Sequence, residues 1–312
     1  MKRNIGMLED QELWNSLCEI AGSDNVRRQE PMKKHTTFRI GGPADYFVIP
    51  HSREEIRQAI EVCRSFKVPC YILGNGSNLL VGDKGYRGVV IQIYKNFCSL
   101  EIQGEEIHVE AGALLGTTAK KAMKASLAGL EFASGIPGTV GGAVAMNAGA
   151  YGGEMKDVLK EITALTEDGR FLTIPREELD LGYRTSIVSK KGYIVLDAVL
   201  SLKKGNREEI EAKMEELKSR RVEKQPLEYP SAGSTFKRPE GYFAGKLIMD
   251  AGLRGFSVGG AMVSEKHCGF VINRGDATAK DVRDLMDAVS RKVREQFGVE
   301  LEPEVKMLGE FE

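Results

Sequence analysis

A serine with the potential for chemistry stands in the segment SAGSTFKRP, residues 231–239. Ser234 follows Gly233, whose flexible backbone favours a bend, and the cationic pair Lys237 and Arg238 comes shortly after it. A serine nucleophile usually lies in a G-x-S-x-G elbow beside a histidine base. This segment reads A-G-S-T-F, and the four histidines are dispersed along the chain. The sequence therefore disfavours a serine hydrolase, and a turn serine that bonds its own backbone is the ordinary alternative.

Two glycine-rich segments form a second candidate for chemistry. The first is LGNGSNLL, residues 73–80, where a predicted strand ends in a turn whose backbone amides can wrap a pyrophosphate. It is not a Rossmann fingerprint, because Leu79 occupies the place of the third glycine. A tight structural turn is the equal alternative. The candidate cofactor-binding residues of this segment are Gly74, Asn75, Gly76, Ser77 and Asn78.

The second glycine-rich segment is GIPGTVGGAVAMNAGAYGGE, residues 135–154. Its glycines and alanines bury little side-chain area, so the segment makes a poor core of its own. It suits a backbone that lies against a large flat group, and we favour a bound cofactor over close backbone packing. The candidate residues are Gly135, Ile136, Pro137, Gly138, Gly141, Gly142, Ala143, Asn147, Gly149 and Ala150.

Composition and charge exclude several classes of protein. The chain has 312 residues and a formal net charge of −1, so no global basic field attracts nucleic acid or an anionic membrane. Its apolar runs are too short to span a bilayer. The start, MKRNIGMLEDQELW, lacks the apolar core of a secretion signal, so we expect a cytoplasmic protein. The five cysteines are scattered, which predicts reduced thiols. The four histidines lack the spacing of metal ligands, which predicts no metal site.

Secondary-structure elements must position these residues, and the order of helices and strands expected from the sequence predicts an α+β fold with many short strands. Apolar spacing and capping residues predict helices over 8–21, 52–63, 115–123, 207–222 and 278–297. Aliphatic runs predict strands over 70–73, 88–93, 107–112 and 193–202, and a hairpin over 162–174. The stretch RRVEKQPLEYP, residues 220–230, contains two prolines and predicts a domain boundary.

A set of spaced motifs resembles one enzyme family. The motifs are HTTFRIGGPADYFVIP (35–50), LGNGSNLLVGDKGYRGVVI (73–91), GIPGTVGGAVAMNAGAYGGE (135–154), GYRTS (182–186), AGSTFKRP (232–239) and LEPEVKMLGE (301–310). In this order and spacing they resemble the UDP-N-acetylenolpyruvoylglucosamine reductases, the MurB family of bacterial peptidoglycan synthesis. The resemblance extends over nearly the whole chain from about residue 30.

The resemblance implies a fold of three parts. Residues 1–95 and 96–222 would together form an FAD-binding fold of the vanillyl-alcohol-oxidase type, and residues 223–312 an α+β substrate-binding domain. It also implies non-covalent FAD as cofactor and NADPH as hydride donor. Some members carry an insertion with a tyrosine after the GYR motif. Here TSIVSKKGYIVL follows directly, which is similar to the shorter second type of the family and predicts no tyrosine lid.

The implied reaction reduces the enol ether of UDP-N-acetylglucosamine enolpyruvate to UDP-N-acetylmuramate. Hydride passes from NADPH to flavin N5 and then to the β carbon of the enolpyruvyl group. Negative charge develops on the α carbon and spreads into the carboxylate. The site therefore needs groups that stabilise this charge and a donor that delivers a proton to the α carbon.

Three residues match the catalytic positions that the resemblance implies. Ser234 would donate the proton to the α carbon. Glu304, in LEPEVK, would lie near the developing charge, either protonated or relaying a proton, although Glu302 is a rival on the same strand face. Arg184, in GYRTS, would hold the substrate carboxylate with its planar guanidinium. The ordinary alternative for such an arginine is a surface ion pair.

Candidate substrate-binding residues surround these positions. Tyr183 could pack or bond beside Arg184. The diphosphate could be bound by basic residues near the predicted domain boundary, namely Arg221, Lys224, Lys237 and Arg238. Two alternatives remain open: another FAD-dependent oxidoreductase of the same fold, which would not need the catalytic set, and a non-catalytic nucleotide-binding module, which would not need Ser234.

Overall fold

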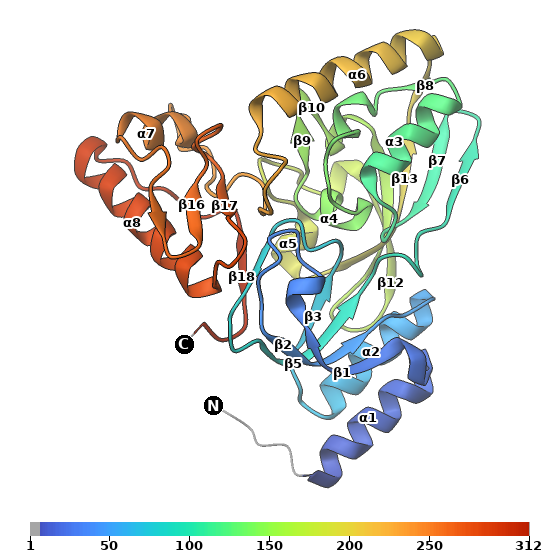
Figure 1. Ribbon diagram of the computed structural model, residues 1–312. Coiled ribbons are helices and arrows are strands. Elements are labelled where there is room, and N and C mark those ends of the chain that lie inside the picture. The colour runs from blue at the N-terminus through green and yellow to red at the C-terminus, as the bar shows by residue number, and fades with distance from the viewer. Residues whose placement is uncertain (1–6, 312) are drawn as a thin grey trace. The chain divides into compact units, whose positions relative to one another are not determined.

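The computed structural model of the protein describes residues 7–311, which pack into two compact units (Figure 1). The first unit contains 7–27, 46–75 and 88–220, and the second contains 28–45, 76–87 and 221–311. Each unit has its own hydrophobic core. The segments 28–45 and 76–87 thus pack with the C-terminal part of the chain, although they fall within the first predicted domain. The predicted three-domain division stays a prediction.

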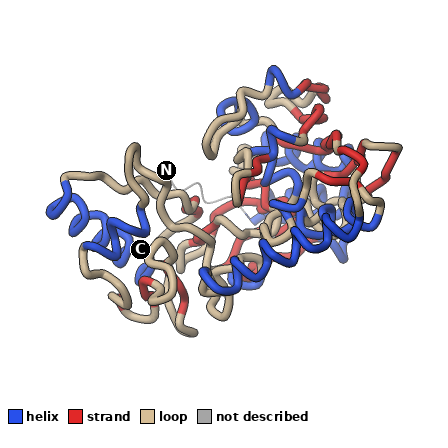
Figure 2. The backbone as a smooth tube through the Cα atoms, turned by 90° about the horizontal axis from the view of Figure 1, so that it is seen from above, coloured by secondary structure: helices blue, strands red, loops and turns tan. Residues whose placement is uncertain are grey.

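Residues 1–6 and 312 lie outside the described residues. The charged stretch on which the cytoplasmic prediction rests begins among them. Between residues 7 and 311, no helix is long and apolar enough to cross a membrane. Helices and strands are both present along the chain, which agrees with the predicted α+β class (Figure 2).

An antiparallel sheet with strand order β12-β11-β13-β7-β6 forms the centre of the first unit. Its strands span Leu100–Gln103 (β6), Glu106–Glu110 (β7), Leu159–Leu165 (β11), Phe171–Pro175 (β12) and Ile194–Ser201 (β13). The predicted hairpin is confirmed, since β11 and β12 pair across a turn at Asp168 and Gly169. Gly169 has a φ of +83°, which residues with a side chain rarely adopt.

The first unit contains the helices predicted over 8–21, 52–63 and 115–123, together with two short helices, at 140–145 and 187–191, that were not predicted. They span Met7–Ala21 (α1), Arg53–Ser65 (α2), Leu115–Lys124 (α3), Val140–Ala145 (α4) and Ile187–Lys191 (α5). At the start of α2, Ser52 accepts a hydrogen bond from the Glu55 amide at 3.2 Å, as its capping pattern predicts. The predicted charged helix is also present, as α6 (Arg207–Lys224).

A second sheet, with strand order β1-β2-β5-β3, supports the first glycine-rich loop. Its strands span Val26–Pro31 (β1), Pro43–Val48 (β2), Cys70–Leu73 (β3) and Tyr86–Gln92 (β5). β3 runs parallel to β5 and ends at Leu73, directly before Gly74. The predicted strand that leads into the glycine turn is therefore confirmed. Short strand pairs join Leu127–Ala128 (β8) to Lys203–Lys204 (β14) and Gly149–Ala150 (β9) to Gly153–Glu154 (β10).

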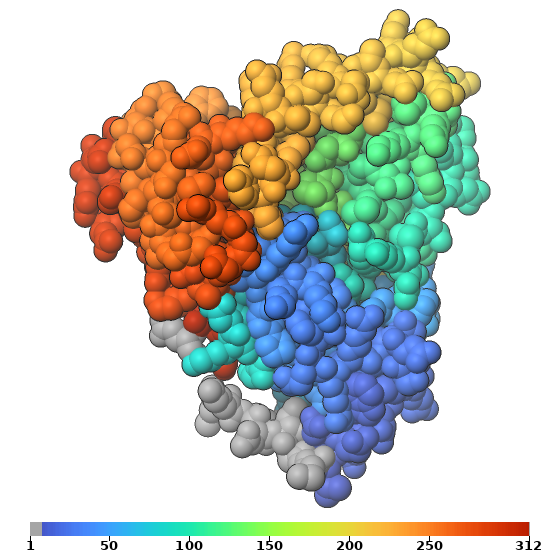
Figure 3. All heavy atoms as spheres, in the orientation of Figure 1, coloured from blue at the N-terminus to red at the C-terminus, as the bar shows by residue number. Residues whose placement is uncertain are grey.

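The second unit is built from a three-stranded sheet, two helices and a short parallel strand pair. The sheet strands are Ser257–Val258 (β15), Ala261–Val263 (β16) and Val271–Asn273 (β17), the helices are Ala244–Asp250 (α7) and Ala279–Phe297 (α8), and the parallel pair is Leu79–Val81 (β4) with Lys306–Leu308 (β18). Figure 3 shows the C-terminal stretch of this unit, orange to red, as one packed body. The predicted long helix is confirmed, with Thr278 as its N-cap and Gly298 as its left-handed C-cap.

The N-terminus of α8 is tied to the loop after β4. The Asp83 carboxylate accepts hydrogen bonds from the Ala279 amide at 2.8 Å and from the Lys280 amide at 3.0 Å. A helix N-terminus leaves such amides without intrahelical partners and favours negative charge. Asp83 therefore fastens the segment 76–87 to the C-terminal part of the chain.

Candidate active site

The segment that carries Ser234 is held by backbone hydrogen bonds along both of its edges. On one edge, the amide of Thr235 donates to the carbonyl of Gly269 at 2.8 Å. On the other edge, the carbonyl of Thr235 accepts from the amide of Glu304 at 2.8 Å. The second unit therefore brings two of the predicted catalytic residues, Ser234 and Glu304, onto neighbouring hydrogen-bonded segments.

Ser234 and Thr235 differ in the surroundings of their side chains. Thr235 is 1% exposed, and its Oγ1 accepts a hydrogen bond from the Val271 amide at 2.9 Å. Ser234 is exposed and follows Gly233, which has a φ of +78°. Because Thr235 is anchored inside the unit, the Ser234 hydroxyl remains at the surface, where a ligand can reach it.

The two rival acids, Glu302 and Glu304, have different environments. The Glu302 side chain is 69% exposed and forms an ion pair with Lys237. Glu304 is half-buried, and its carbonyl accepts a hydrogen bond from the Asn78 side chain at 3.1 Å. The carbonyl of Asn78 in turn accepts from the Lys306 amide at 3.1 Å. These contacts fix the Glu304 backbone and favour it over Glu302 as the candidate acid.

Sequence reasoning missed two polar residues of the second unit, of which Thr37 braces the Ser234 segment and Asn273 holds the nearby stretch at Phe38. Thr37 Oγ1 donates to the carbonyl of Ser231 at 2.6 Å. Asn273, which is 3% exposed, donates from its side-chain amide to the carbonyl of Phe38 at 3.1 Å. A polar residue at the end of an apolar run, as in FVIN at 270–273, was the available signal, because a buried amide must find partners.

The two glycine-rich segments contact each other in the first unit. The Asn75 side chain donates a hydrogen bond to the carbonyl of Pro137. Gly74 packs so closely on Thr139 that a Cβ at position 74 would lie 2.5 Å from Thr139 Oγ1. The remaining predicted residues of the first loop, Gly76, Ser77 and Asn78, belong to the second unit. Gly76 has a φ of +62°.

The shape of the second glycine-rich segment fits a large flat cofactor. Val140, Ala143 and Val144 of α4 are buried, whereas Gly135, Pro137 and Gly142 are exposed. A Cβ added at Gly142 would meet Thr139 Oγ1 at 3.6 Å, an ordinary contact that does not explain why glycine stands there. At Gly135 and Gly142 the exposed surface of the loop is backbone, which a cofactor can approach closely. By this test the residues present fit FAD.

Arg184 lies in a tight turn of the first unit with a left-handed backbone. Its φ is +55°, which is uncommon for a residue with a side chain. The turn is closed by a hydrogen bond from the Gly182 amide to the Thr185 carbonyl at 3.1 Å. The guanidinium carbon of Arg184 lies 5.0 Å from the centre of the Tyr183 ring, and Tyr183 is 51% exposed. The predicted pair of Tyr183 and Arg184 is thus stacked by a cation–π contact.

The Arg184 turn is fastened to the glycine-rich segment. The Ser186 hydroxyl, which is fully buried, donates to the carbonyl of Ala145 at 2.8 Å. The Asn147 side chain donates to the carbonyl of Gly182 at 3.1 Å. After the turn, α5 leads to β13, and no inserted loop stands between them.

The four predicted diphosphate-binding residues lie in two places. Lys237 and Arg238 follow Ser234 on the same segment, and the Arg238 guanidinium carbon is 4.6 Å from the centre of the Phe243 ring. Arg221 and Lys224 lie in the last turn of α6, where Arg221 donates to the Gln225 side chain at 3.3 Å.

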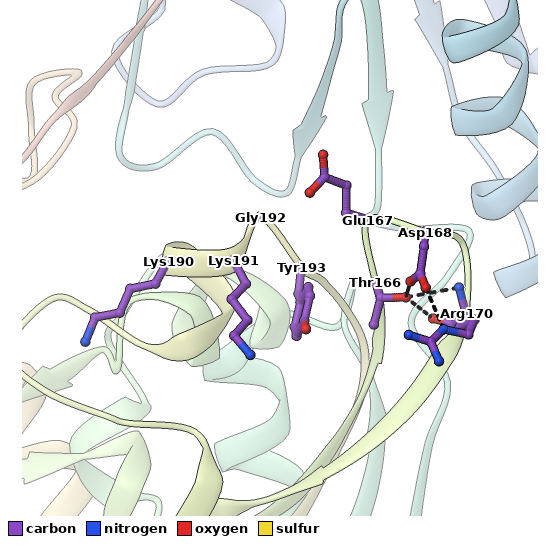
Figure 4. A pocket seen from close by; sticks show the side chains of 8 residues that line it. All are labelled: Thr166, Glu167, Asp168, Arg170, Lys190, Lys191, Gly192 and Tyr193. Carbon is purple, nitrogen blue, oxygen red and sulfur yellow. Dashed lines mark hydrogen bonds and ion pairs between the residues drawn. The ribbon is translucent and has the colours of Figure 1, made fainter.

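A surface hollow in the first unit contains none of the predicted site residues (Figure 4). It is lined by Thr166, Glu167, Asp168, Arg170, Lys190, Lys191, Gly192 and Tyr193. Two of its basic side chains form ion pairs: Arg170 Nε lies 2.6 Å from Asp168, and Lys190 pairs with Asp180, which is not among the lining residues. The hydroxyl of Thr166, followed by the nearby Arg170 charge, lowers the pKa of the exposed Asp168 despite an opposing desolvation effect.

Comparisons with known proteins place this architecture in a family. Residues 225–308 match the family described as UDP-N-acetylenolpyruvoylglucosamine reductase, C-terminal domain, and residues 44–175 match an FAD binding domain. A protein of Agathobacter rectalis named UDP-N-acetylenolpyruvoylglucosamine reductase is 61% identical over 314 residues, which cover 97% of this chain and 100% of that protein. A protein of the same name from Clostridioides difficile is 50% identical over 97% of this chain and 100% of its own length. This chain belongs to the UDP-N-acetylenolpyruvoylglucosamine reductase family.

A solved member of the reductase family has the same fold. The crystal structure of the enzyme from Thermus caldophilus has a TM-score of 0.79 and 40% sequence identity, and the match covers 91% of this chain and 99% of that one. The predicted class, an α+β protein with an FAD-binding fold of the vanillyl-alcohol-oxidase type and a C-terminal α+β domain, is confirmed. The chain is an FAD-dependent oxidoreductase of peptidoglycan precursor synthesis, as the motifs predict.

Replacing Thr235 with valine tests how the reductase holds the Ser234 segment. Thr235→Val keeps the size of the side chain but leaves the Val271 amide without its buried acceptor, at a cost of about 1–3 kcal/mol. We expect the melting temperature of the FAD-saturated protein to fall by several degrees in scanning calorimetry. Ser234→Ala, at the exposed neighbouring position, should shift it by about 1 °C or less. Equal melting temperatures for the two variants would contradict this role of Thr235.

Proposed function

We propose that the chain reduces UDP-N-acetylglucosamine enolpyruvate to UDP-N-acetylmuramate, with NADPH, the reductant of the family, as hydride donor. The observation that carries the proposal is the backbone hydrogen bond that sets Glu304 on the segment beside Ser234. A proton donor and an acid on adjacent segments are what protonation of a carbanion-like carbon requires. Family membership supplies the substrate class.

FAD would be held by the two glycine-rich loops, through the backbone at Gly74 and Asn75 and through the backbone of residues 135–150. Their mutual contacts and their exposed backbone support this assignment. When bound, FAD would supply the two-electron chemistry that carries hydride between NADPH and the β carbon of the enolpyruvyl group. The chain supplies what remains, which is placement of the substrate, stabilisation of its charge and delivery of a proton.

Ser234 delivers the proton to the α carbon. Addition of hydride at the β carbon breaks the carbon–carbon π bond and leaves its electron pair on the α carbon, shared with the carboxylate. The Ser234 hydroxyl then gives its proton to the α carbon and regains one from solvent, to which it is exposed. Glu304 lies near the developing charge and assists, either as a protonated acid or as a proton relay.

Arg184 holds the carboxylate of the substrate. A guanidinium can bind both carboxylate oxygens at once, and its charge favours the enolate that forms. Tyr183, stacked on Arg184, limits the directions in which the guanidinium can point. Lys237, Arg238, Arg221 and Lys224 would bind the diphosphate, and Lys237 would exchange its present partner Glu302 for phosphate oxygens.

The function is tested by purifying the protein and measuring its flavin content and its oxidation of NADPH. We expect a yellow protein that oxidises NADPH rapidly when UDP-N-acetylglucosamine enolpyruvate is present and forms UDP-N-acetylmuramate in equal amount. UDP-N-acetylglucosamine, which lacks the enolpyruvyl group, serves as the control and should not be reduced. A colourless protein that takes up no FAD, or NADPH oxidation without the product, would contradict the proposal.

Ser234→Ala tests the assignment of the proton donor. Loss of a general acid typically lowers the rate by 10²- to 10⁴-fold, so turnover of the enolpyruvyl substrate should fall by about that factor. Bleaching of the flavin absorbance by NADPH, which needs no such proton, should change by less than about twofold. Ser257→Ala, an exposed serine of the same unit, is the matched control and should turn over normally. Normal turnover by Ser234→Ala would show that another group donates the proton.

A further inference from the structure

The side-chain amide of Asn147 forms hydrogen bonds to protein groups through both its nitrogen and its oxygen. The residue is 1% exposed, although it lies in the glycine-rich segment that was predicted to bind FAD. Its Nδ2 donates to Glu154 Oε2 at 2.9 Å and to the carbonyl of Gly182 at 3.1 Å, and its Oδ1 accepts from the Lys156 amide at 2.9 Å. Both amide hydrogens therefore have protein partners.

The geometry of this position specifies asparagine. Its φ is +43°, in the left-handed region that asparagine and glycine enter most readily. Glycine could take this backbone but could not reach Gly182 or Glu154. Aspartate has the right size, but its carboxylate cannot donate to the Gly182 carbonyl and would repel Glu154. Asparagine is thus required for the hydrogen bonds of its side-chain amide, and not only for its left-handed backbone conformation.

Glu154 completes the set of groups around Asn147. Its carboxylate lies 2.7 Å from Lys156 Nζ, and the capping bonds of the short helix Met155–Asp157 hold its backbone. The hydrogen bond from Lys156 lowers the pKa of Glu154 against a smaller desolvation effect, and Asn147 and the charges of Lys156 and Arg184 lower it further. Glu154 is therefore an anion at neutral pH that attracts Arg184.

The Gly182 carbonyl that Asn147 holds belongs to the turn of Arg184. The amide of Gly182 closes that turn on Thr185, so Gly182 is bonded at both its amide and its carbonyl. Arg184 sits in the turn with a φ of +55°, a conformation that costs on the order of 1–3 kcal/mol and persists where surrounding bonds enforce it. The bond from Asn147 is one of those that enforce it.

We propose that Asn147 is a positioning residue for Arg184: its amide fixes the Gly182–Thr185 turn, so that the guanidinium is presented in the orientation that binds a substrate carboxylate. The proposal rests on the proposed function, in which Arg184 binds that carboxylate. Two-point binding by a guanidinium depends on its alignment, so a loosened turn lowers affinity for the carboxylate while the rest of the ligand still binds.

The test compares two ligands by calorimetric titration of the oxidised, FAD-loaded protein. UDP-N-acetylglucosamine enolpyruvate carries the carboxylate, and UDP-N-acetylglucosamine does not. The dissociation constant of UDP-N-acetylglucosamine divided by that of UDP-N-acetylglucosamine enolpyruvate measures the contribution of the enolpyruvyl group. In Asn147→Gly, which keeps the backbone conformation and removes the amide, we expect this ratio to fall about tenfold toward one. FAD content and affinity for UDP-N-acetylglucosamine should stay within about twofold of the wild type.

Four further variants decide between positioning and a general structural role. Arg184→Ala should lower the ratio, and Asn147→Gly added to it should cause no further fall, because the two residues act on one contact. Asn147→Asp should lower the ratio as Asn147→Gly does, since it too loses the donor to Gly182. Asn206→Gly makes the same replacement at an exposed residue of the same unit, whose side chain caps α6, and should leave the ratio unchanged.

The possible contrary outcomes are distinct. An unchanged ratio in Asn147→Gly and Asn147→Asp, with a lowered ratio in Arg184→Ala, would overturn the positioning role. Loss of FAD from both Asn147 variants would also overturn it, because Asn147 would then serve the cofactor instead. A wild-type ratio near one, unaffected by Arg184→Ala, would contradict the proposed role of Arg184 itself and so the function on which this inference rests.

Discussion

The backbone hydrogen bonds of Thr235 are the constraint on which the candidate site depends. A serine side chain is short, so the position of its hydroxyl is determined by the backbone of the segment that carries it. The amide, carbonyl and hydroxyl of Thr235 are bonded to Gly269, Glu304 and Val271, which fixes the segment on both edges and from the interior. Ser234 is thereby set at the surface, and Glu304 is brought to the adjacent segment.

The glycine-rich segment of the first unit has two tasks that its composition does not separate. Gly74 is glycine because its backbone packs closely on Thr139. Gly142 leaves its backbone open at the surface, which suits the approach of a flat cofactor. Asn147, a few residues further on, uses its side chain to hold the turn of Arg184. One segment thus supports both the candidate cofactor loops and the candidate carboxylate-binding residue. A reductase that must align cofactor and substrate gains from having both supported by the same short stretch.

Local signals in the sequence predicted much of this fold, and long-range contacts account for what was missed. The apolar stripe of α8, its Thr278 cap and its Gly298 stop are local features, as is the hairpin turn at Gly169. The brace from Thr37 to Ser231 joins residues 194 positions apart and leaves no periodic pattern. The motifs already favoured Glu304 over Glu302, but the ion pair that occupies Glu302 with Lys237 was not predicted. The role of Asn147 depends on which partners its amide meets. Residue type alone does not specify such partners.

The central claim, that a solvent-exchangeable acid of the site protonates the α carbon of an enolpyruvyl substrate, is tested most directly by running the reaction in deuterium oxide. The Ser234 hydroxyl is exposed and exchanges its proton with solvent before each turnover. Proton NMR and mass spectrometry of the UDP-N-acetylmuramate formed from NADPH should therefore show deuterium at the α carbon of the lactyl group. Product whose α carbon carries ordinary hydrogen, or the absence of product, would contradict the account.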